Sequence, residues 1–367
     1  MLILGIYFSR KNYCFIGVLM RIKILLAIVG MLFYSSSFAT LEQCYQEGVD
    51  AEYEKVLETC KPYEKKDARA TGLLAEANVQ LDQDDKLALT DAKWTIDFYE
   101  KNGAPTSVEG MKSYVYLVYL AGELYYFGSD DIKVNVSKGL LYIEKAARLG
   151  YDVAQNQLAN LYVRASEVPA TSFAKAYMWY KLAVANGSLD ARRAFILNHE
   201  QKFIKQYPYC VSQGRTYIGD AYLEGFGGLS KDNDKALEWY KKAYEVDHIS
   251  PVEVGLAKAY MKKGETEKAL MYTKEAITQP YAPAFVEMFE LEKDNVKRYA
   301  YLSVAISLFE RPDLDYWEQF NEYCLPDISE KGIGFARRNI KKIKLTDAEK
   351  LKGNNLTREI LDQWHKS

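Results

Sequence analysis

Histidine is nearly absent from this sequence, with 3 in 367 residues. So few histidines argue against a histidine-rich metal site or a catalytic histidine relay. His199, His248 and His365 lie far apart, without other metal-binding side chains at useful spacing, so we expect surface or capping roles and no metal or cofactor. The chain also lacks a basic surplus: its net charge is −2, which argues against nucleic acid as a partner.

Acidic residues are missing from residues 1–39, where four Lys and Arg residues occur. The sequence Met20-Arg-Ile-Lys23 is a short basic segment, followed by the apolar run Ile24–Tyr34 and small residues up to Ala39. The run has eleven residues, whereas a membrane span needs roughly 20. This order predicts a secretory signal peptide over 1–39, with the true start at Met20 and a periplasmic or secreted product. The alternative is an uncleaved membrane anchor; with cleavage, no stable membrane span remains.

Cysteine is scarce, with 5 in the chain, and no C-x-x-C motif suggests a redox pair. Without Cys14, four remain, and four cysteines in an exported protein permit two disulfides in three connectivities. Cys44 and Cys60 would lie about 24 Å apart on one straight helix, so their bridge requires a helical hairpin. Cys210 and Cys324 can pair only if the tail folds back. We predict the Cys44–Cys60 bridge first; buried free thiols are the alternative.

A short pattern recurs four times along the chain: a small residue, then Tyr three positions later. The copies begin at Gly122, Ala159, Gly219 and Ala257. A second pattern, Lys-Ala/Gly-x-x-aromatic-x-x-x-Ala, follows each copy and begins at Lys138, Lys175, Lys235 and Lys268. The small residues are 37, 60 and 38 positions apart. A period near 33–38 is typical of paired-helix repeats, and the step of 60 predicts an insert of about one helix near 189–207.

Spacings of three and four place these residues on one helix face. The small residues let two helices approach closely, and the aromatic residues fill the gap to the next layer. Most of the 30 tyrosines are therefore predicted to pack in the core. No stretch alternates with period two, so we expect almost no sheet. Asp234, just before Lys235-Ala236, is predicted to cap its helix.

Residues 218–243, IGDAYLEGFGGLSKDNDKALEWYKKA, closely resemble the Sel1-like repeat, a relative of the tetratricopeptide repeat. Residues 118–150 and 154–187 are similar but less complete, and 253–277 resemble a plain tetratricopeptide repeat. The resemblance implies an all-α fold: a right-handed α-solenoid superhelix of paired antiparallel helices. It also implies a non-catalytic adaptor or scaffold that binds other proteins.

The expected organisation has four parts. Residues 1–39 form the signal peptide, and 40–115 form degenerate N-terminal helical repeats. Residues 116–290 form the repeat solenoid with its inserted helix, and 291–367 form a C-terminal repeat and a cap, since the pattern fades after Pro326.

Catalytic motifs are weak. Ser172-Phe-Ala-Lys175 fits S-x-x-K, but no Lys-Thr-Gly follows and Lys175 belongs to the repeat pattern. We interpret it as accidental and expect no enzyme activity.

The remaining candidate is a groove. In proteins with this kind of repeat, the first helices line the concave face, and positions three before and one after the small residue point into it. These positions hold Tyr119, Glu123, Asn156, Asn160, Thr216, Asp220 and Lys258, with Val254 as the remaining member. Amides can bond to backbone and Tyr supplies rigid contact area, which favours an extended peptide segment or a partner loop. The alternative is a merely solvated inner face.

The sequence thus predicts a periplasmic solenoid that binds a protein partner without catalysis. Two alternatives remain open. One is an assembly factor for an envelope polymer, exopolysaccharide or peptidoglycan, and the other is an enzyme of unrecognised type.

Overall fold

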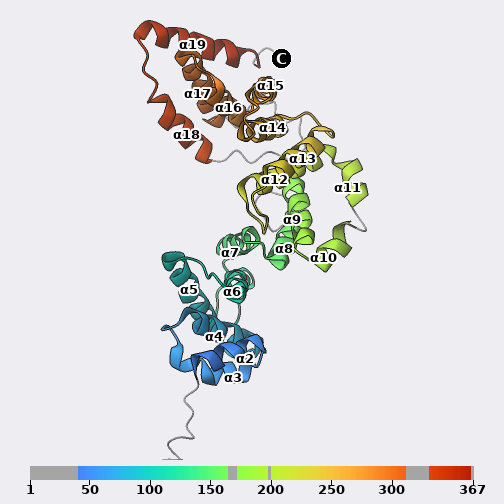
Figure 1. Cartoon of the computed structure of the whole chain (residues 1–367), viewed down its shortest axis with the longest axis vertical. Coiled ribbons are helices and arrows are strands. Elements are labelled where there is room, and N and C mark those ends of the chain that lie inside the picture. Colours follow the sequence, from blue (N-terminus) through green and yellow to red (C-terminus); the bar gives the residue numbers. More distant parts are fainter. Residues whose placement is uncertain (1–39, 164–171, 197–199, 311–329, 365–367) are drawn as a thin grey trace, which may run out of the picture. The chain divides into compact units, whose positions relative to one another are not determined.

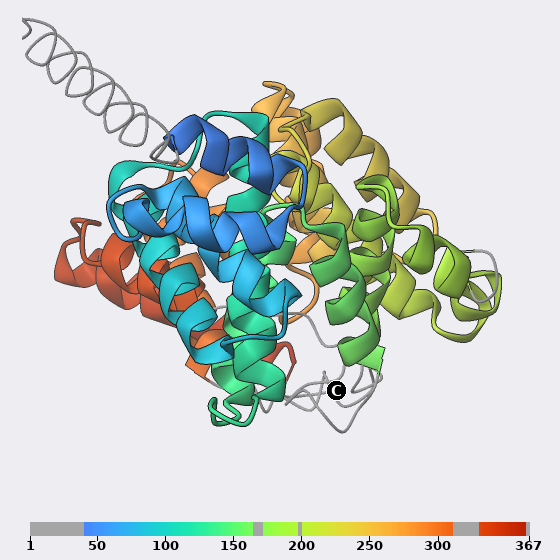
Figure 2. The same ribbon diagram turned by 90° about the horizontal axis from the view of Figure 1, so that it is seen from below.

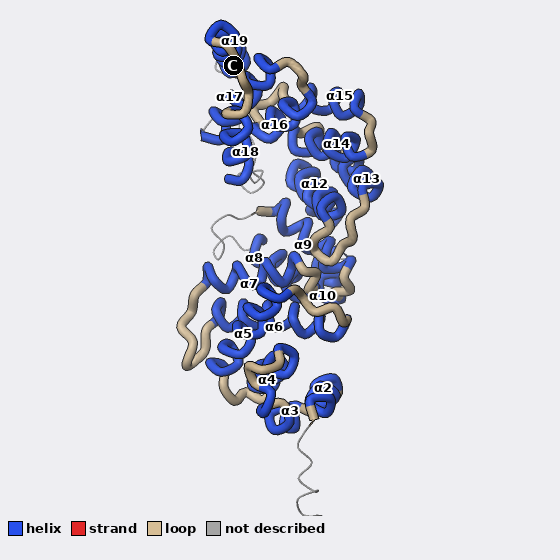
Figure 3. Tube along the Cα trace, turned by 60° about the vertical axis from the view of Figure 1, so that its left-hand side comes forward, coloured by secondary structure: helices blue, strands red, loops and turns tan. Residues whose placement is uncertain are grey.

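The computed structural model describes residues 40–163, 172–196, 200–310 and 330–364. Within these residues the regular structure is helical, apart from one isolated bridge between Ser129 and Ile132 (Figure 3). The prediction of an all-α fold is confirmed. The predicted signal peptide lies outside the described residues. The chain divides into two compact units, residues 1–117 and 118–367.

The first unit is built from helices, drawn in blue to teal in Figures 1 and 2, and three of them begin at side-chain caps. Their bounds are α2 (Leu41–Val49), α3 (Tyr53–Thr59), a 3-10 turn (Lys61–Tyr63), α4 (Ala68–Gln80) and α5 (Asp85–Asn102). The side chains of Thr40, Asp67 and Asp84 accept backbone N–H groups at the starts of α2, α4 and α5. These caps satisfy donors that the first helical turn leaves unpaired, so the sequence sets where each helix starts.

A disulfide joins Cys44 on α2 to Cys60 at the end of α3, with their Cα atoms 5.0 Å apart. The two helices form the hairpin that this bridge requires, so the predicted pairing is confirmed. Both cysteines are fully buried against Val56, Leu73 and Leu74. The bridge therefore lies inside the small core of this unit.

The second predicted bridge involves Cys210, which is buried in α12 (Pro208–Glu224). Cys324 lies outside the described residues. The Cys210–Cys324 pairing stays a prediction.

The second unit is a succession of helix pairs, and α6 (Val108–Phe127) crosses into it from the first unit. The later pairs pack each helix against its partner. Their bounds are α7 (Val136–Arg148), α8 (Asp152–Val163), α9 (Phe173–Ala185), α12 (Pro208–Glu224), α13 (Asn233–Tyr244), α14 (Ser250–Lys262), α15 (Thr266–Ala276), α16 (Ala282–Leu291) and α17 (Asn295–Glu310). Two further helices, α18 (Glu330–Ile340) and α19 (Asp347–Asp362), pack against α17.

The predicted insert follows α9. Its described residues form α10 (Leu189–Ala191), a π-helical turn (Arg192–Ile196) and α11 (Glu200–Gln206). The expectation of roughly one helix is thus replaced by short pieces. Pro208 is the first residue of α12, where a missing N–H costs nothing.

Glycines bring the paired helices together where the repeat pattern places small residues. A Cβ added to Gly122 would lie 2.9 Å from the backbone nitrogen of Ile143 on α7. At the later repeat, Gly219 of α12 and Gly255 of α14 both face the ring of Tyr240, which is fully buried between them. At Gly122 and Gly219 a larger side chain would push the helices apart, and the other two copies have alanine at this place, so every copy keeps a residue no larger than Ala.

The lysine and the tyrosine of the two repeat patterns meet in every copy. Each lysine at the start of a second helix places its Nζ over the tyrosine ring of the preceding first helix. The distances from Nζ to ring centroid are 4.2 Å for Lys138–Tyr125, 5.6 Å for Lys175–Tyr162, 5.5 Å for Lys235–Tyr222 and 5.1 Å for Lys268–Tyr260. Such cation–π contacts contribute about 0.5–1 kcal/mol each at exposed sites. These tyrosines serve the fold, as predicted from their spacing.

Candidate partner-binding site

A pocket of about 450 Å³ opens between α6 and α8, and we name it the α6–α8 pocket. Three of the residues predicted for the groove, Tyr119, Asn156 and Asn160, line it. The remaining lining residues are Tyr126, Phe127, Val153, Gln157 and Leu161. Glu123, a fourth predicted residue, accepts a hydrogen bond of 3.0 Å from Gln157 Nε2. The structure thus brings four predicted residues together.

Side-chain amides of α8 supply the polar part of this pocket. Asn160 is held from both sides: its Nδ2 donates to the Asn156 carbonyl at 2.9 Å, and its Oδ1 accepts from Tyr180 Oη at 2.8 Å. By contrast, Asn156 Oδ1 and Gln157 Oε1 are buried and have no hydrogen-bond partner among the described residues. Buried acceptors without partners cost the fold roughly 1–3 kcal/mol each. Rotation of these two side chains into the pocket would let N–H groups of a partner recover that cost.

Aromatic and apolar side chains form the rest of the pocket. The ring of Tyr119 lies 5.0 Å from that of Tyr151, centroid to centroid, which fixes its orientation. Phe127 and Val153 are 63% and 43% exposed, so they offer apolar contact area at the rim. Rigid aromatic rings beside amides are typical of surfaces that bind other proteins.

The other predicted groove residues lie elsewhere. Thr216 is 3% exposed and donates to the Ser212 carbonyl one turn earlier, so its side chain does not reach an open surface, which corrects the prediction for this position. Asp220 is half-buried and accepts a 2.7 Å hydrogen bond from Tyr240 Oη. Burial raises the pKa of Asp220, while Lys258 and Tyr240 oppose that shift. Lys258 itself lies 3.6 Å from Glu287.

Packing of α12 explains why the predicted positions separate. This helix packs extensively against α9, the second helix of the preceding repeat, as well as against α13. At that contact a Cβ on Gly214 would meet the Ala174 carbonyl and the Tyr177 ring. Thr216 lies on the opposite face, together with Ser212 and Gly219, which contact Ala243 and Tyr240, so α13 covers it. Asp220, four residues on, lines a different pocket, formed by α7, α8, α9, α12 and the loop after α12.

Comparison with protein families gives three matches to the Sel1 repeat, over residues 117–151, 152–188 and 212–248. These segments correspond to the pairs α6–α7, α8–α9 and α12–α13, and the first and third begin inside α6 and α12. The chain contains three Sel1 repeats. The three repeats predicted from the sequence are confirmed, and the α6–α8 pocket is formed by the first helices of the first two Sel1 repeats.

Solved structures that are similar to this chain include the following two. The Sel1 repeat protein from Oxalobacter formigenes is 16% identical, and the match covers 83% of this chain and 100% of that one with a TM-score of 0.32. The protective antigen c5321 from uropathogenic Escherichia coli, which displays an SLR fold, is also 16% identical, and the match covers 89% and 95% with a TM-score of 0.26. No curated protein sequence matches significantly.

Sel1 repeats generally mediate protein–protein interactions. The S-x-x-K motif has a structural role in this Sel1-like fold, because Ser172 Oγ accepts the Lys175 N–H at 3.2 Å and caps α9. Among the described residues, no three His, Cys, Asp or Glu side chains gather in a way that could hold a metal ion. None of the described helices combines the length and apolar composition that a membrane span needs.

Sequence reasoning missed Tyr126, Phe127 and Gln157 of the α6–α8 pocket. The rule of three before and one after the small residue follows one narrow stripe of each helix. Gln157 lies next to that stripe, and Tyr126 and Phe127 lie at the end of α6, where the chain leaves the helix. A prediction that also included the neighbouring positions on each first helix, and its last turn, would have identified these three residues.

Proposed function

We propose that this chain is an exported, non-catalytic adaptor that binds an extended segment or loop of a partner protein in the α6–α8 pocket. One observation carries the proposal: Asn156 Oδ1 and Gln157 Oε1 lack partners in a pocket that aromatic rings border. An extended peptide offers backbone N–H groups to such amides and side chains to such rings. The Sel1 repeats, as a class of interaction modules, agree with this role.

Export to the periplasm is supported by two features. The buried Cys44–Cys60 disulfide suits an oxidising compartment. Residues 20–39 consist of a short basic segment followed by an apolar run and a small-residue end, and this order resembles a secretory signal.

Replacing Asn156 by Ala is expected to weaken partner binding about fivefold or more without lowering the melting temperature. Loss of one hydrogen-bonding group at an interface costs about 1 kcal/mol, which corresponds to roughly a fivefold change. The fold loses little because Asn156 Oδ1 has no partner in the described residues. The measurement is recovery of partner from cross-linked cell envelopes, with thermal unfolding recorded in parallel.

Asn355→Ala is the control, because Asn355 is a helical asparagine on the exposed surface of α19 and does not line the pocket. It should leave recovery unchanged. Adding Asn160→Ala to the first variant should weaken binding further, but at some cost in stability, since Tyr180 Oη loses its acceptor. Equal recovery with wild type and Asn156→Ala would contradict the proposed pocket. Recovery of glycan alone would favour the envelope-polymer alternative.

A further inference from the structure

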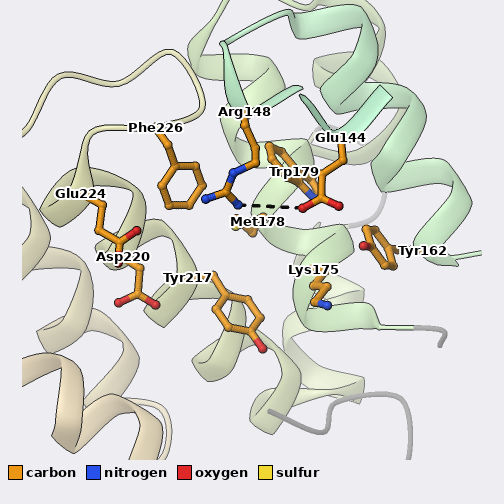
Figure 4. A pocket seen from close by; sticks show the side chains of 10 residues that line it. All are labelled: Glu144, Arg148, Tyr162, Lys175, Met178, Trp179, Tyr217, Asp220, Glu224 and Phe226. Atoms are coloured by element: carbon orange, nitrogen blue, oxygen red, sulfur yellow. Dashed lines mark ion pairs between the residues drawn. The ribbon is translucent and has the colours of Figure 1, made fainter. Parts of the chain in front are cut away.

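A second cavity, of about 400 Å³, lies between α7, α8, α9 and α12, and we name it the α7–α12 pocket (Figure 4). One wall comes from a single face of α12, where Tyr217, Asp220 and Glu224 follow at helical spacing. Arg148 and Phe226 border it above in this view, and Lys175 and Tyr162 lie on the other side. The pocket therefore combines aromatic rings with charges of both signs.

The α12 wall is electrostatically unfavourable for the fold alone. Asp220 and Glu224 are four residues apart on one helix, where like charges repel by about 0.2–0.5 kcal/mol. Glu224 is the last residue of α12, where the helix dipole disfavours a carboxylate. Burial raises the pKa of Asp220, Lys258 and the Tyr240 hydrogen bond oppose that shift, and the nearby Glu224 adds a smaller increase. A cation placed between these two carboxylates would relieve all three effects.

The arginine and lysine side chains near this wall already interact with other groups of the protein. Arg148 lies 3.9 Å from Glu144 and stacks 4.4 Å above the Phe226 ring. Lys175 lies over the Tyr162 ring. Two lysines reach the wall from α14: Lys258 pairs with Glu287 at 3.6 Å, and Lys262 Nζ donates to the Leu223 carbonyl at 3.3 Å. Glu224 itself is exposed, and no ion pair within the described residues compensates it.

We propose that the α7–α12 pocket binds a basic side chain, arginine or lysine, of a protein partner, between the Asp220–Glu224 wall and the rings of Tyr217 and Phe226. The proposal rests on the proposed adaptor function only in that the cation belongs to a protein. A guanidinium group fits best, because it bonds to carboxylates and also stacks on aromatic faces. The cavity is large enough for a side chain rather than a bare ion, and its two adjacent carboxylates are fewer ligands than a metal ion takes.

Titration with N-acetyl-arginine amide tests this site without any natural partner. Met178 lines the pocket, so the protein is labelled with ¹³C at its methionine methyl groups and followed by NMR. The Met178 resonance is expected to shift saturably, while those of the exposed Met261 and Met271 stay in place. The neutral analogue N-acetyl-citrulline amide, of nearly the same shape, should bind at least fivefold more weakly. Added salt should weaken the arginine probe, because the contact is ionic.

Glu224→Gln should weaken the arginine probe about fivefold or more, since it removes the exposed carboxylate of the wall without altering the core. The matched control, Glu267→Gln, changes an exposed glutamate on α15 and should leave the affinity unchanged.

Equal binding of the arginine and citrulline probes would overturn the proposal, as would a Met178 resonance that does not respond. Preferential binding of N-acetyl-glutamate amide would also overturn it, by assigning the pocket to Lys175 and Arg148. Because the probe is a small molecule, each of these three failures leaves the adaptor function of the α6–α8 pocket standing.

Discussion

Raising the pH from 4.5 to 8 is expected to lower the free energy of unfolding of the 118–367 unit by about 3 kcal/mol through Glu253 alone. Glu253 is 5% exposed on α14, and its Oε2 has no hydrogen-bond partner in the described part of the chain. Burial, with a smaller contribution from Glu275, raises the pKa of Glu253 from 4.5 to about 7. The folded state therefore holds a proton on this carboxyl that the unfolded state releases.

The sign follows from the raised pKa. Below pH 4.5 the carboxyl is protonated in both states, and the folded protein retains its full stability. As the pH rises through about 7, the buried group must ionise or the protein unfold, so stability is lost. Glu253→Gln keeps a neutral side chain of the same shape at every pH. This variant should be as stable as wild type at pH 4.5 and more stable by about 3 kcal/mol at pH 8.

Urea unfolding at both pH values, followed by circular dichroism, measures this difference. Glu267→Gln, an exposed change on the neighbouring α15, is the control and should follow wild type throughout. The account of Glu253 is wrong if Glu253→Gln and wild type lose the same stability between the two pH values.

Removal of the Cys44–Cys60 disulfide is expected to destabilise the 1–117 unit by about 3 kcal/mol, since the bridge closes a loop of 16 residues. The double replacement by Ala avoids placing serine hydroxyls in the core, where both cysteines are fully buried. The helices α2, α3 and α4 share that core, so they should open together. Hydrogen exchange of their backbone amides should become faster by about two orders of magnitude.

The 118–367 unit serves as the internal control for this experiment. Exchange in α12 and α14 should remain at the wild-type rate, because neither helix belongs to the core around the disulfide. Unchanged exchange in α2–α4 would mean that the bridge contributes little to this unit. Faster exchange in both units would point to a general loss of folding instead.

The repeat architecture was predictable because the residues that determine the packing of each helix pair lie close together in the sequence. A small residue recurs at the same place in each repeat, because the two helices of a pair approach closely there. These residues are Gly122, Ala159, Gly219 and Ala257. The lysine and tyrosine of each repeat meet for the same local reason. The Cys44–Cys60 bridge also followed from a short hairpin. Asp234 shows the limit of such reasoning: Asp232, two residues earlier, caps α13.

The candidate site was only partly predictable because it depends on packing across repeats. The prediction took the positions three before and one after each small residue, and it assumed that the inner face of every first helix is exposed. At α12 the helices α9 and α13 cover opposite faces, so α13 buries Thr216, and Asp220 lies in a pocket of its own. The step of 60 residues signalled an insert, but not how the neighbouring helices close around it. Contacts between residues far apart in sequence leave no local pattern to read.

Site-specific photocrosslinking in living cells tests the central claim, protein binding in the α6–α8 pocket, most directly. A benzophenone side chain replaces Phe127, which is 63% exposed at the pocket rim, or Leu141, which is 68% exposed on α7 outside it. The account predicts one covalent protein adduct from position 127, absent from position 141 and weakened by Asn156→Ala. Adducts of equal yield at both positions, or none at position 127, would contradict it.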